Sequence, residues 1–481
     1  MTQAIDFMSP TLGSGKQSAG EKQGKALMTA WGLLIALCLL ARAGKLLILV
    51  FPAGSVAVGL FLYFRAPFLY VSFAWWMLFF GSLVRKVIDY QSGYVTPGRW
   101  GLAALLVAAI SLITLFKYLP KCHREGGMPF IISFLGLTYA LMMGIAYGRL
   151  SPQFIVGAIE WLAPMAFGFH IFINWRSYLD YRRHLLTTFI WGTLVMGAYG
   201  IFQYCVAPAW DKFYLDQLGV NSFGKAVPFD LRVWGTSTSP QEFAAIMLAG
   251  IILIFSGQGA IKFAAAGTGY LGFLLTMARS GWIGWLASIV MFLPSINLKL
   301  QMRLLVTILV MALVVVPLTQ IEPFAEVISD RIESFTNGRD DTSLEDRTAG
   351  YQQLSSEALS EFVGLGLGGG SGSKTALGGS DTSIFPLLFQ FGWFGTIPYI
   401  GGILLILVKS FSIKQLRSDA FGSAARAVAL GIFAQLAFNQ IFTNVFGFVL
   451  WGFLGLSLAA VNYHQFSPYR SPQKEKLISQ S

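Results

Sequence analysis

The sequence predicts an all-α polytopic membrane protein, a bundle of about 12–14 transmembrane helices with two long outer-face loops, the larger of them partly helical. Of its 481 residues, 55% are hydrophobic and only 12% are charged, whereas soluble domains carry about 25% charged residues. Apolar runs long enough to cross a hydrocarbon layer of about 30 Å recur from residue 27 to residue 462. Long polar stretches interrupt these runs only at 209–239 and 321–382, so a single anchoring span is excluded.

The apolar runs predict one transmembrane domain at 27–462, with cytoplasmic tails at 1–26 and 463–481. The first 25 residues contain lysines among small polar residues and lack the cleavage site of a signal peptide, which indicates a tail. The predicted helices lie at 27–41, 46–64, 67–84, 99–117, 129–147, 152–174, 185–208, 240–256, 259–278, 281–296, 302–320, 383–409, 423–440 and 444–462.

Basic residues predict the orientation of these helices, because short cytoplasmic loops are enriched in lysine and arginine. With the N-terminus inside, the cytoplasmic loops contain Lys117, Lys121, Arg124, Arg176, Arg182, Arg183, Lys299, Arg303, Lys414 and Arg417. Both long polar stretches then lie on the outer face. The same orientation places basic residues at 42–45 and 85–86 outside, so the first two apolar runs could instead form one broken or re-entrant element.

Charge and cysteine usage exclude some function classes. The formal net charge is +11, but the basic residues of a membrane protein set its topology and need not indicate nucleic acid as a partner. Cys38, Cys122 and Cys205 lie in or beside separate apolar segments, with neither CxxC spacing nor clustered histidines around them. This pattern argues against a disulfide framework and against metal ligation.

Three arginines on the predicted outer face are candidates for binding an anion. Arg232 lies in FDLRVWGTSTSPQEF, before the turn that opens the next apolar helix, and Arg279 interrupts two apolar runs in LLTMARSGWIGW. Arg347 lies in the first turn of an amphipathic helix predicted from DRTAGYQQLSSEALSEF, where a cation opposes the helix dipole. Arg347 could instead pair with Asp346, and Arg232 could be a solvated residue beside a capped helix.

Arginine suits a pyrophosphate, because its planar guanidinium donates paired hydrogen bonds and keeps its charge when partly desolvated. We therefore expect the three arginines to bind a lipid-linked diphosphate. Glu160, within the run 152–174, is a further candidate because ionisable groups in membranes are costly, whereas His170 is expected near the inner interface. The glycine run at 364–370 lacks a preceding strand and a following GK[ST], so we expect a flexible connection there and no nucleotide site.

Four ordered motifs resemble those of the O-antigen polymerase and O-antigen ligase superfamily. They are WGTSTSPQEFAAIML, TMARSGWIGWL, DRTAGYQQL with GLGLGGG, and DTSIFPLLFQFGWFGTIPYIGG, and the resemblance covers about residues 190–460. It implies a glycosyltransferase, independent of metal and cofactor, that moves a glycan from undecaprenyl pyrophosphate to an acceptor hydroxyl with inversion. Arg232, Arg279 and Arg347 match the positions that the resemblance implies for the donor phosphates, and we expect Tyr351, Glu242 and Glu160 to contact substrate.

The chain departs from the ligase pattern at Asp381 and Thr382, which stand where ligases place a His-Asn pair. Asp381 could act as the general base in place of that histidine, although loop carboxylates are mostly solvated or helix-capping groups. The loss of the histidine favours a polymerase of lipid-linked repeat units into exopolysaccharide or O-antigen over a ligase that transfers glycan to lipid A core.

The resemblance also implies a bacterial inner membrane, an active site on the periplasmic face, and a groove between helices for the polyprenyl tail. A chain-length regulator and a flippase of the same pathway are the implied protein partners. Two other classes stay open. A lipid-linked glycan flippase or transporter would favour paired broken helices and midplane charges, and a non-catalytic scaffold would use the arginines to contact proteins.

Overall fold

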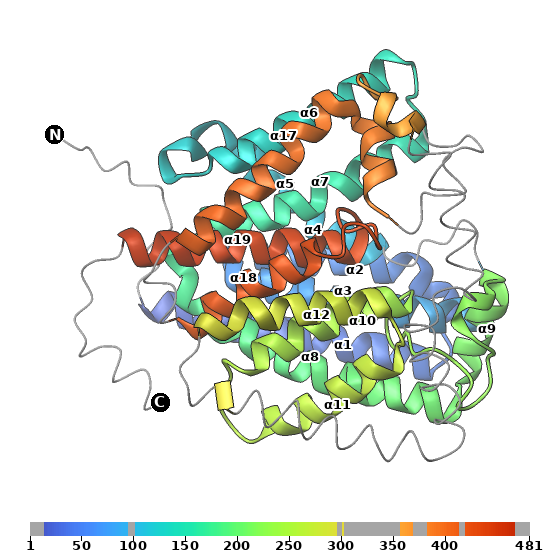
Figure 1. The fold of residues 1–481 in the computed structure, drawn as a ribbon. Coiled ribbons are helices and arrows are strands. Elements are labelled where there is room, and N and C mark those ends of the chain that lie inside the picture. Colours follow the sequence, from blue (N-terminus) through green and yellow to red (C-terminus); the bar gives the residue numbers. More distant parts are fainter. Residues whose placement is uncertain are drawn as a thin grey trace.

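A computed structural model describes residues 14–94, 102–295, 301–302, 356–368, 382–412 and 419–466. These residues form helices joined by turns and contain no strand (Figure 1). Within them, nine helices are long and apolar enough to cross a membrane, and three shorter apolar helices accompany them. The prediction of an all-α polytopic membrane protein is confirmed.

The first part of the bundle consists of α1 (Ser14–Leu40), α2 (Gly44–Arg65), α3 (Pro67–Ser92), α4 (Leu102–Ala109), α5 (Leu112–Tyr118), η1 (Leu119–Glu125), α6 (Met128–Ala146), α7 (Pro152–Ile173), η2 (Trp175–Ser177) and α8 (Tyr178–Val206). The second part consists of α9 (Ala209–Leu218), η3 (Asn221–Phe223), α10 (Pro240–Ile254), α11 (Ile261–Leu275), α12 (Arg279–Phe292), η4 (Leu293–Ser295), α17 (Ile384–Ser412), α18 (Ala420–Phe433) and α19 (Asn444–Phe466).

Helices occupy the predicted segments wherever the structure describes them, and almost all of the segment 302–320 lies outside the described residues. The first two apolar runs form two separate helices, α1 and α2, which pack together across a turn at residues 41–43. Each is long enough to span, so the alternative of one broken or re-entrant element is wrong. The predicted helix at 423–440 is too long, since α18 ends at Phe433 and turns follow.

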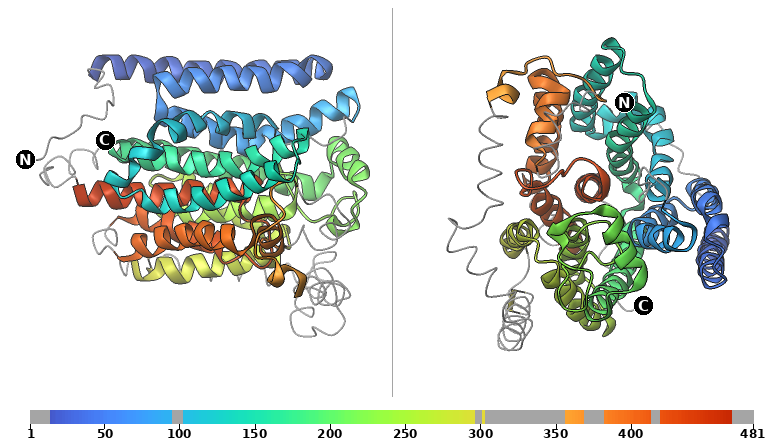
Figure 2. Two further views of the ribbon diagram at one scale, coloured as in Figure 1. Left: turned by 90° about the horizontal axis from the view of Figure 1, so that it is seen from above. Right: turned by 90° about the vertical axis from the view of Figure 1, so that its right-hand side faces the viewer.

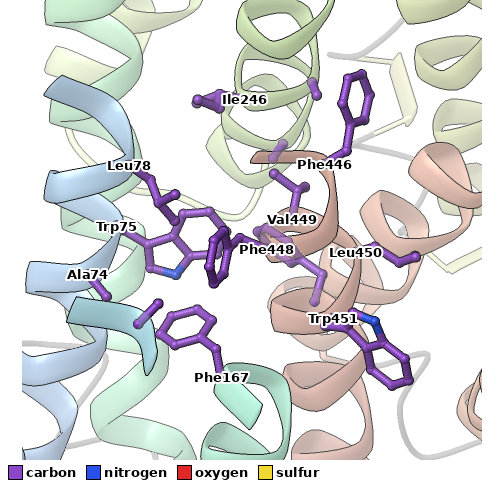
Figure 3. Packing of buried hydrophobic residues seen from close by; sticks show 14 of the residues in the cluster. Ala74, Trp75, Leu78, Phe167, Ile246, Phe446, Phe448, Val449, Leu450 and Trp451 are labelled. Carbon is purple, nitrogen blue, oxygen red and sulfur yellow. The ribbon is translucent and has the colours of Figure 1, made fainter. Parts of the chain in front are cut away.

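The core lies around α19, which is buried along nearly its whole length. Small residues allow helices to approach closely in such a bundle, and Gly455 of α19 faces Gly168 of α7 so closely that a Cβ on either residue would overlap the opposing backbone. Trp75 of α3 fills the space beside them and contacts Phe167 and Phe453 edge to face or tilted (Figure 3). This tight centre holds the helices that support both loops.

The described parts of the two long polar stretches lie at the same end of the bundle. The described residues 207–239 and 356–368 lie at the right in the left-hand view of Figure 2, whereas α1 begins and α19 ends at the opposite side. We call the end with residues 207–239 and 356–368 the loop end, and the end where α1 begins and α19 ends the termini end. Both stretches were predicted on one face, and their described parts do lie at the same end of the bundle.

Residues 361–368 form an ordered segment that enters the bundle between α6 and α17. The helical conformation of α17 breaks at Gly392, where φ is 59° and ψ is −176°. The carbonyls of Phe389 and Gln390, before the break, accept hydrogen bonds from the backbone of Leu365 and Gly366 at 2.6 and 3.0 Å. Irregular backbone inside a bundle requires such partners, and the segment supplies them.

Glycine is required in this segment by its backbone. Gly364, Gly366 and Gly368 have φ values of 81°, 74° and 78°, which L-residues with a Cβ rarely adopt. A Cβ on Gly366 would also overlap the backbone of Gly144 in α6. The expectation of a flexible connection is therefore wrong for the described residues 364–368.

Candidate functional site

Arg232 ties the first polar stretch to the turn between α11 and α12. Its Nε donates to the carbonyl of Thr276 at 3.1 Å, its Nη2 to that of Met277 at 3.4 Å, and its Nη1 to that of Ser222 at 3.0 Å. Val233 extends this link, because its backbone N–H donates to the carbonyl of Leu275 at 2.9 Å. The guanidinium is thus fixed at the loop end against Met277, which lies two residues before Arg279 in the chain.

The turn that Arg232 contacts is conformationally unusual. Met277 has a φ of 51° although it is not glycine, and such a backbone costs about 1–2 kcal/mol. The Thr276 hydroxyl steadies the turn by donating to the carbonyl of Phe273 at 2.6 Å and by accepting from the N–H of Ala278 at 3.2 Å. Strain of this kind concentrates at functional sites. The turn directly precedes α12, whose first residue is Arg279.

The helices α10 and α12 begin side by side at the loop end. Gly281 of α12 lies against Ala244 of α10, where an added Cβ would come 3.0 Å from the Ala244 Cβ (Figure 1). Ser239 caps α10 by accepting a hydrogen bond from the N–H of Glu242 at 3.2 Å. Helix N-termini carry partial positive charge and bind anions. The structure therefore brings Arg232 and Arg279 to two adjacent positive helix ends.

A buried ion pair supports the turn that follows Arg232, at Gly235. Lys86 near the end of α3 and Asp211 of α9 are both fully buried, with Nζ and Oδ1 3.0 Å apart. Lys86 also donates to the carbonyl of Gly235 at 2.8 Å, and the Tyr199 hydroxyl donates to the other carboxylate oxygen of Asp211 at 2.6 Å. Sequence reasoning missed this pair, because it interpreted Lys86 as a basic residue at a helix boundary.

The turn after Arg232 also contacts α8. The side-chain oxygen of Gln203 accepts hydrogen bonds from the backbone N–H groups of Trp234 and Gly235 at 3.1 and 2.8 Å. The side-chain N–H groups of Gln203 and Trp234 and the hydroxyls of Thr236 and Ser237 are buried without a hydrogen-bond partner among the described residues. Buried polar groups are normally satisfied, so this turn has hydrogen-bonding capacity for water or ligand.

Glu242 is separated from the arginines. Two residues are about 200° around a helix, so Glu242 points away from the face on which Ala244 meets α12. Its carboxylate accepts hydrogen bonds from the hydroxyl and the N–H of Thr238. Together with the Ser239 cap this is close to a capping box. The structure thus gives Glu242 a role in starting α10.

Glu160 lies elsewhere in the bundle. It is half-buried in α7, eight residues after the helix begins at the loop end, and no described residue forms a hydrogen bond or ion pair with its carboxylate. His170, further along α7, is buried and lies 2.8 Å from the Thr114 hydroxyl.

Arg347, Tyr351 and Asp381 lie outside the described residues. The chain directly after Asp381 is described. The Ser383 hydroxyl donates to the carbonyl of Asn439 at 2.7 Å and accepts from the N–H of Ile441 at 2.7 Å. The second polar stretch therefore ends at the turn between α18 and α19.

Arg149 is a further loop-end cation that sequence reasoning missed. Its Nη1 donates to the carbonyl of Leu365 at 2.6 Å and so holds the segment 361–368 to the turn before α7. The signal was present, since an arginine between two apolar runs on the predicted outer face departs from the inside bias of basic residues. In the described part of the chain, no three His, Cys, Asp or Glu residues are grouped to hold a metal ion.

No protein-family model matches the chain, and no curated protein matches its sequence. The candidate site therefore stands on the residues themselves.

Proposed function

We propose that the protein is a membrane glycosyltransferase that uses a polyprenyl-diphosphate-linked glycan as donor and polymerises repeat units at the outer face of a bacterial inner membrane. The observation that supports this proposal best is that Arg232 binds the turn directly before Arg279, where α12 begins beside α10. Both arginines lie at the end of an apolar bundle, where the head group of a lipid-embedded donor would be reached.

The proposed chemistry is displacement at the anomeric carbon by an acceptor hydroxyl, with the polyprenyl diphosphate as leaving group. Negative charge grows on the diphosphate as the bond to the sugar breaks. Arginines and helix N-termini that are fixed before the reaction stabilise this charge without reorganising. Because the charge is greatest in the transition state, such contacts accelerate the reaction more than they tighten donor binding. Arg347, from the second polar stretch, completes the proposed phosphate site.

The proposal is tested by the glycan profile of a deletion strain complemented with the wild-type gene, Arg232→Ala, Arg279→Ala or Lys225→Ala. Lys225 is the matched control, because it lies in the same stretch as Arg232 with its side chain 83% exposed. We expect both arginine variants, but not Lys225→Ala, to accumulate single lipid-linked repeats at normal expression levels. Normal long polymer in both arginine variants would refute the phosphate site.

The same profile separates the polymerase from the ligase. A deleted ligase would leave long lipid-linked polymer that is not transferred to lipid A core, whereas a deleted polymerase leaves single repeats. We propose the polymerase, because Asp381 and Thr382 replace the His-Asn pair of the ligase pattern.

A further inference from the structure

The buried pair of Lys86 and Asp211 lies next to the proposed phosphate site without belonging to it. Lys86 contacts the carbonyl of Gly235, three residues after Arg232 in the chain. Its ammonium also lies 5.3 Å from the ring centre of Tyr214 and 5.8 Å from that of Trp234. Both charges are fully buried, so neither side chain can touch a substrate.

Two hydrogen bonds from the interior of the bundle hold the turn that follows Arg232. Lys86 of α3 binds the Gly235 carbonyl, and Gln203 of α8 binds the Gly235 N–H at 2.8 Å. Gly235 has a φ of 52°, so its peptide groups have a defined and unusual orientation. On the outer side, Arg232 itself binds the carbonyls of Thr276 and Met277. The guanidinium can hold that position only if the turn behind it stays in place.

We propose that Lys86 is a positioning residue that fixes Arg232 in its phosphate-binding orientation through the carbonyl of Gly235, an inference that rests on the proposed function. Asp211 neutralises Lys86 in the interior, since a buried charge without a partner is strongly unfavourable. The Tyr199 hydroxyl fixes Asp211 in turn. Residues from α3, α8 and α9 thereby determine the position of the Arg232 side chain.

The neighbouring pair of Arg85 and Asp89 supplies a matched control. These residues also lie on α3, are also buried, and form an ion pair of 2.8 Å. Both belong to the same helix, four residues apart, so their bond does not cross to the stretch 207–239. Removing both charges of either pair avoids leaving one buried charge unpaired, and such replacements by apolar residues often preserve folding.

The test compares two double variants. The 86/211 variant carries Lys86→Met and Asp211→Leu, and the 85/89 variant carries Arg85→Met and Asp89→Leu. The rate of polymer formation from lipid-linked repeats is measured for each, in the wild-type background and in Arg232→Lys. We expect the 86/211 variant to lower kcat/KM about tenfold in the wild-type background, as small displacements of positioned groups do. In the Arg232→Lys background we expect less than about a twofold further loss, because the two changes act through one group.

A readout without glycan chemistry runs in parallel. Arg232 is held by three carbonyls, so we expect trypsin to cleave after Arg232 slowly in purified wild-type protein and in the 85/89 variant, and faster in the 86/211 variant. Equal losses of activity in both backgrounds, or unchanged trypsin protection in the 86/211 variant, would overturn the role of Lys86.

The two proposals fail separately. If the wild-type protein forms no polymer, the proposed polymerase activity is wrong; if Arg232→Lys leaves kcat/KM unchanged, the proposed role of the Arg232 guanidinium in catalysis is wrong. In both cases the trypsin readout still decides whether Lys86 positions the turn.

Discussion

At the scale of single residues, the loop end depends on charges that are satisfied in the interior. A buried ion pair contributes little net stability, because desolvation offsets the attraction, but losing one partner leaves an uncompensated buried charge. Lys86 and Asp211 are in this situation, whereas Lys225 and Asp230 are exposed and 3.8 Å apart. A lysine–aspartate pair therefore affects stability strongly in the interior and little at the surface.

The single variant Lys86→Ala is expected to lower the free energy of unfolding by about 3–5 kcal/mol, because it leaves Asp211 buried without its cation. Unfolding of the purified protein in detergent measures this loss. Lys225→Ala should leave stability nearly unchanged, and the 86/211 double variant should be more stable than Lys86→Ala. A double variant that is less stable than Lys86→Ala would contradict this account.

Gly366→Ala is expected to weaken folding or to displace the segment 361–368, because the added Cβ meets the backbone of Gly144 and the φ of 74° is unfavourable for alanine. The matched control is Gly267→Ala in α11, where no atom lies within 4 Å of an added Cβ and helix propensity favours alanine by about 1 kcal/mol. Thermal unfolding of both variants is the measurement. Equal melting temperatures would show that the segment is not fixed as described.

Residue types predicted where the arginines lie but not the contacts of every candidate. Arg232 and Arg279 were predicted on one face, and Arg232 does bind the turn directly before Arg279. Glu242 was expected to contact substrate, which stays a prediction, and its carboxylate also accepts a hydrogen bond from Thr238 beside the helix cap. Lys86 could not be assigned from sequence, since its partner Asp211 lies 125 residues away.

At the scale of elements, apolar runs predicted where helices lie but not how they end or break. The end of α18 depends on Thr382 and Ser383, which bind the carbonyls of Leu436 and Asn439 and so replace helical hydrogen bonds. The break of α17 at Gly392 is matched by the segment 361–368. Both features arise from contacts between distant parts of the chain, which periodicity does not contain.

Asp419 connects three helices at the termini end. Its carboxylate accepts hydrogen bonds from the N–H groups of Phe421 and Gly422 at the start of α18, and from the Tyr178 hydroxyl of α8 at 2.6 Å. His464 of α19 lies 3.0 Å away through Nε2. Burial raises the pKa of Asp419, but these hydrogen bonds and the nearby positive charge of Arg182 outweigh burial, so its pKa lies below the ordinary value.

This lowered pKa predicts a pH dependence of stability. A carboxyl group whose pKa is lower in the folded state stabilises the fold above its unfolded pKa of about 3.9, and that contribution is lost as the pH falls through the folded pKa. The melting temperatures of wild type and Asp419→Asn should therefore differ between about pH 5 and 7, and the difference should begin to shrink as the pH falls below about 4, toward the lowered folded pKa. A difference that stays constant down to pH 3 would show that the charge of Asp419 contributes nothing.

At the scale of the whole molecule, the described parts of both polar stretches lie at one end of the bundle, and the start of α1 and the end of α19 lie at the other. This arrangement separates a loop end, which carries Arg232, Arg279 and Arg149, from a termini end, which carries Lys117, Arg176 and Arg182. Composition and charge bias predicted this division. They could not predict which loop residues face one another, because that depends on the packing of α10 against α12.

The central claim is that the loop end binds a lipid diphosphate through its arginines. The most direct test is the affinity of the purified protein for undecaprenyl pyrophosphate and for undecaprenyl monophosphate, measured for wild type, Arg279→Ala and Arg65→Ala. Arg65 is an exposed arginine at the termini end of α2 and controls for lost charge. Charge-assisted hydrogen bonds contribute about 1.5–3 kcal/mol. We therefore expect Arg279→Ala to weaken pyrophosphate binding at least about tenfold, with Arg65→Ala unchanged. Equal affinity of wild type and Arg279→Ala for the pyrophosphate would contradict the account.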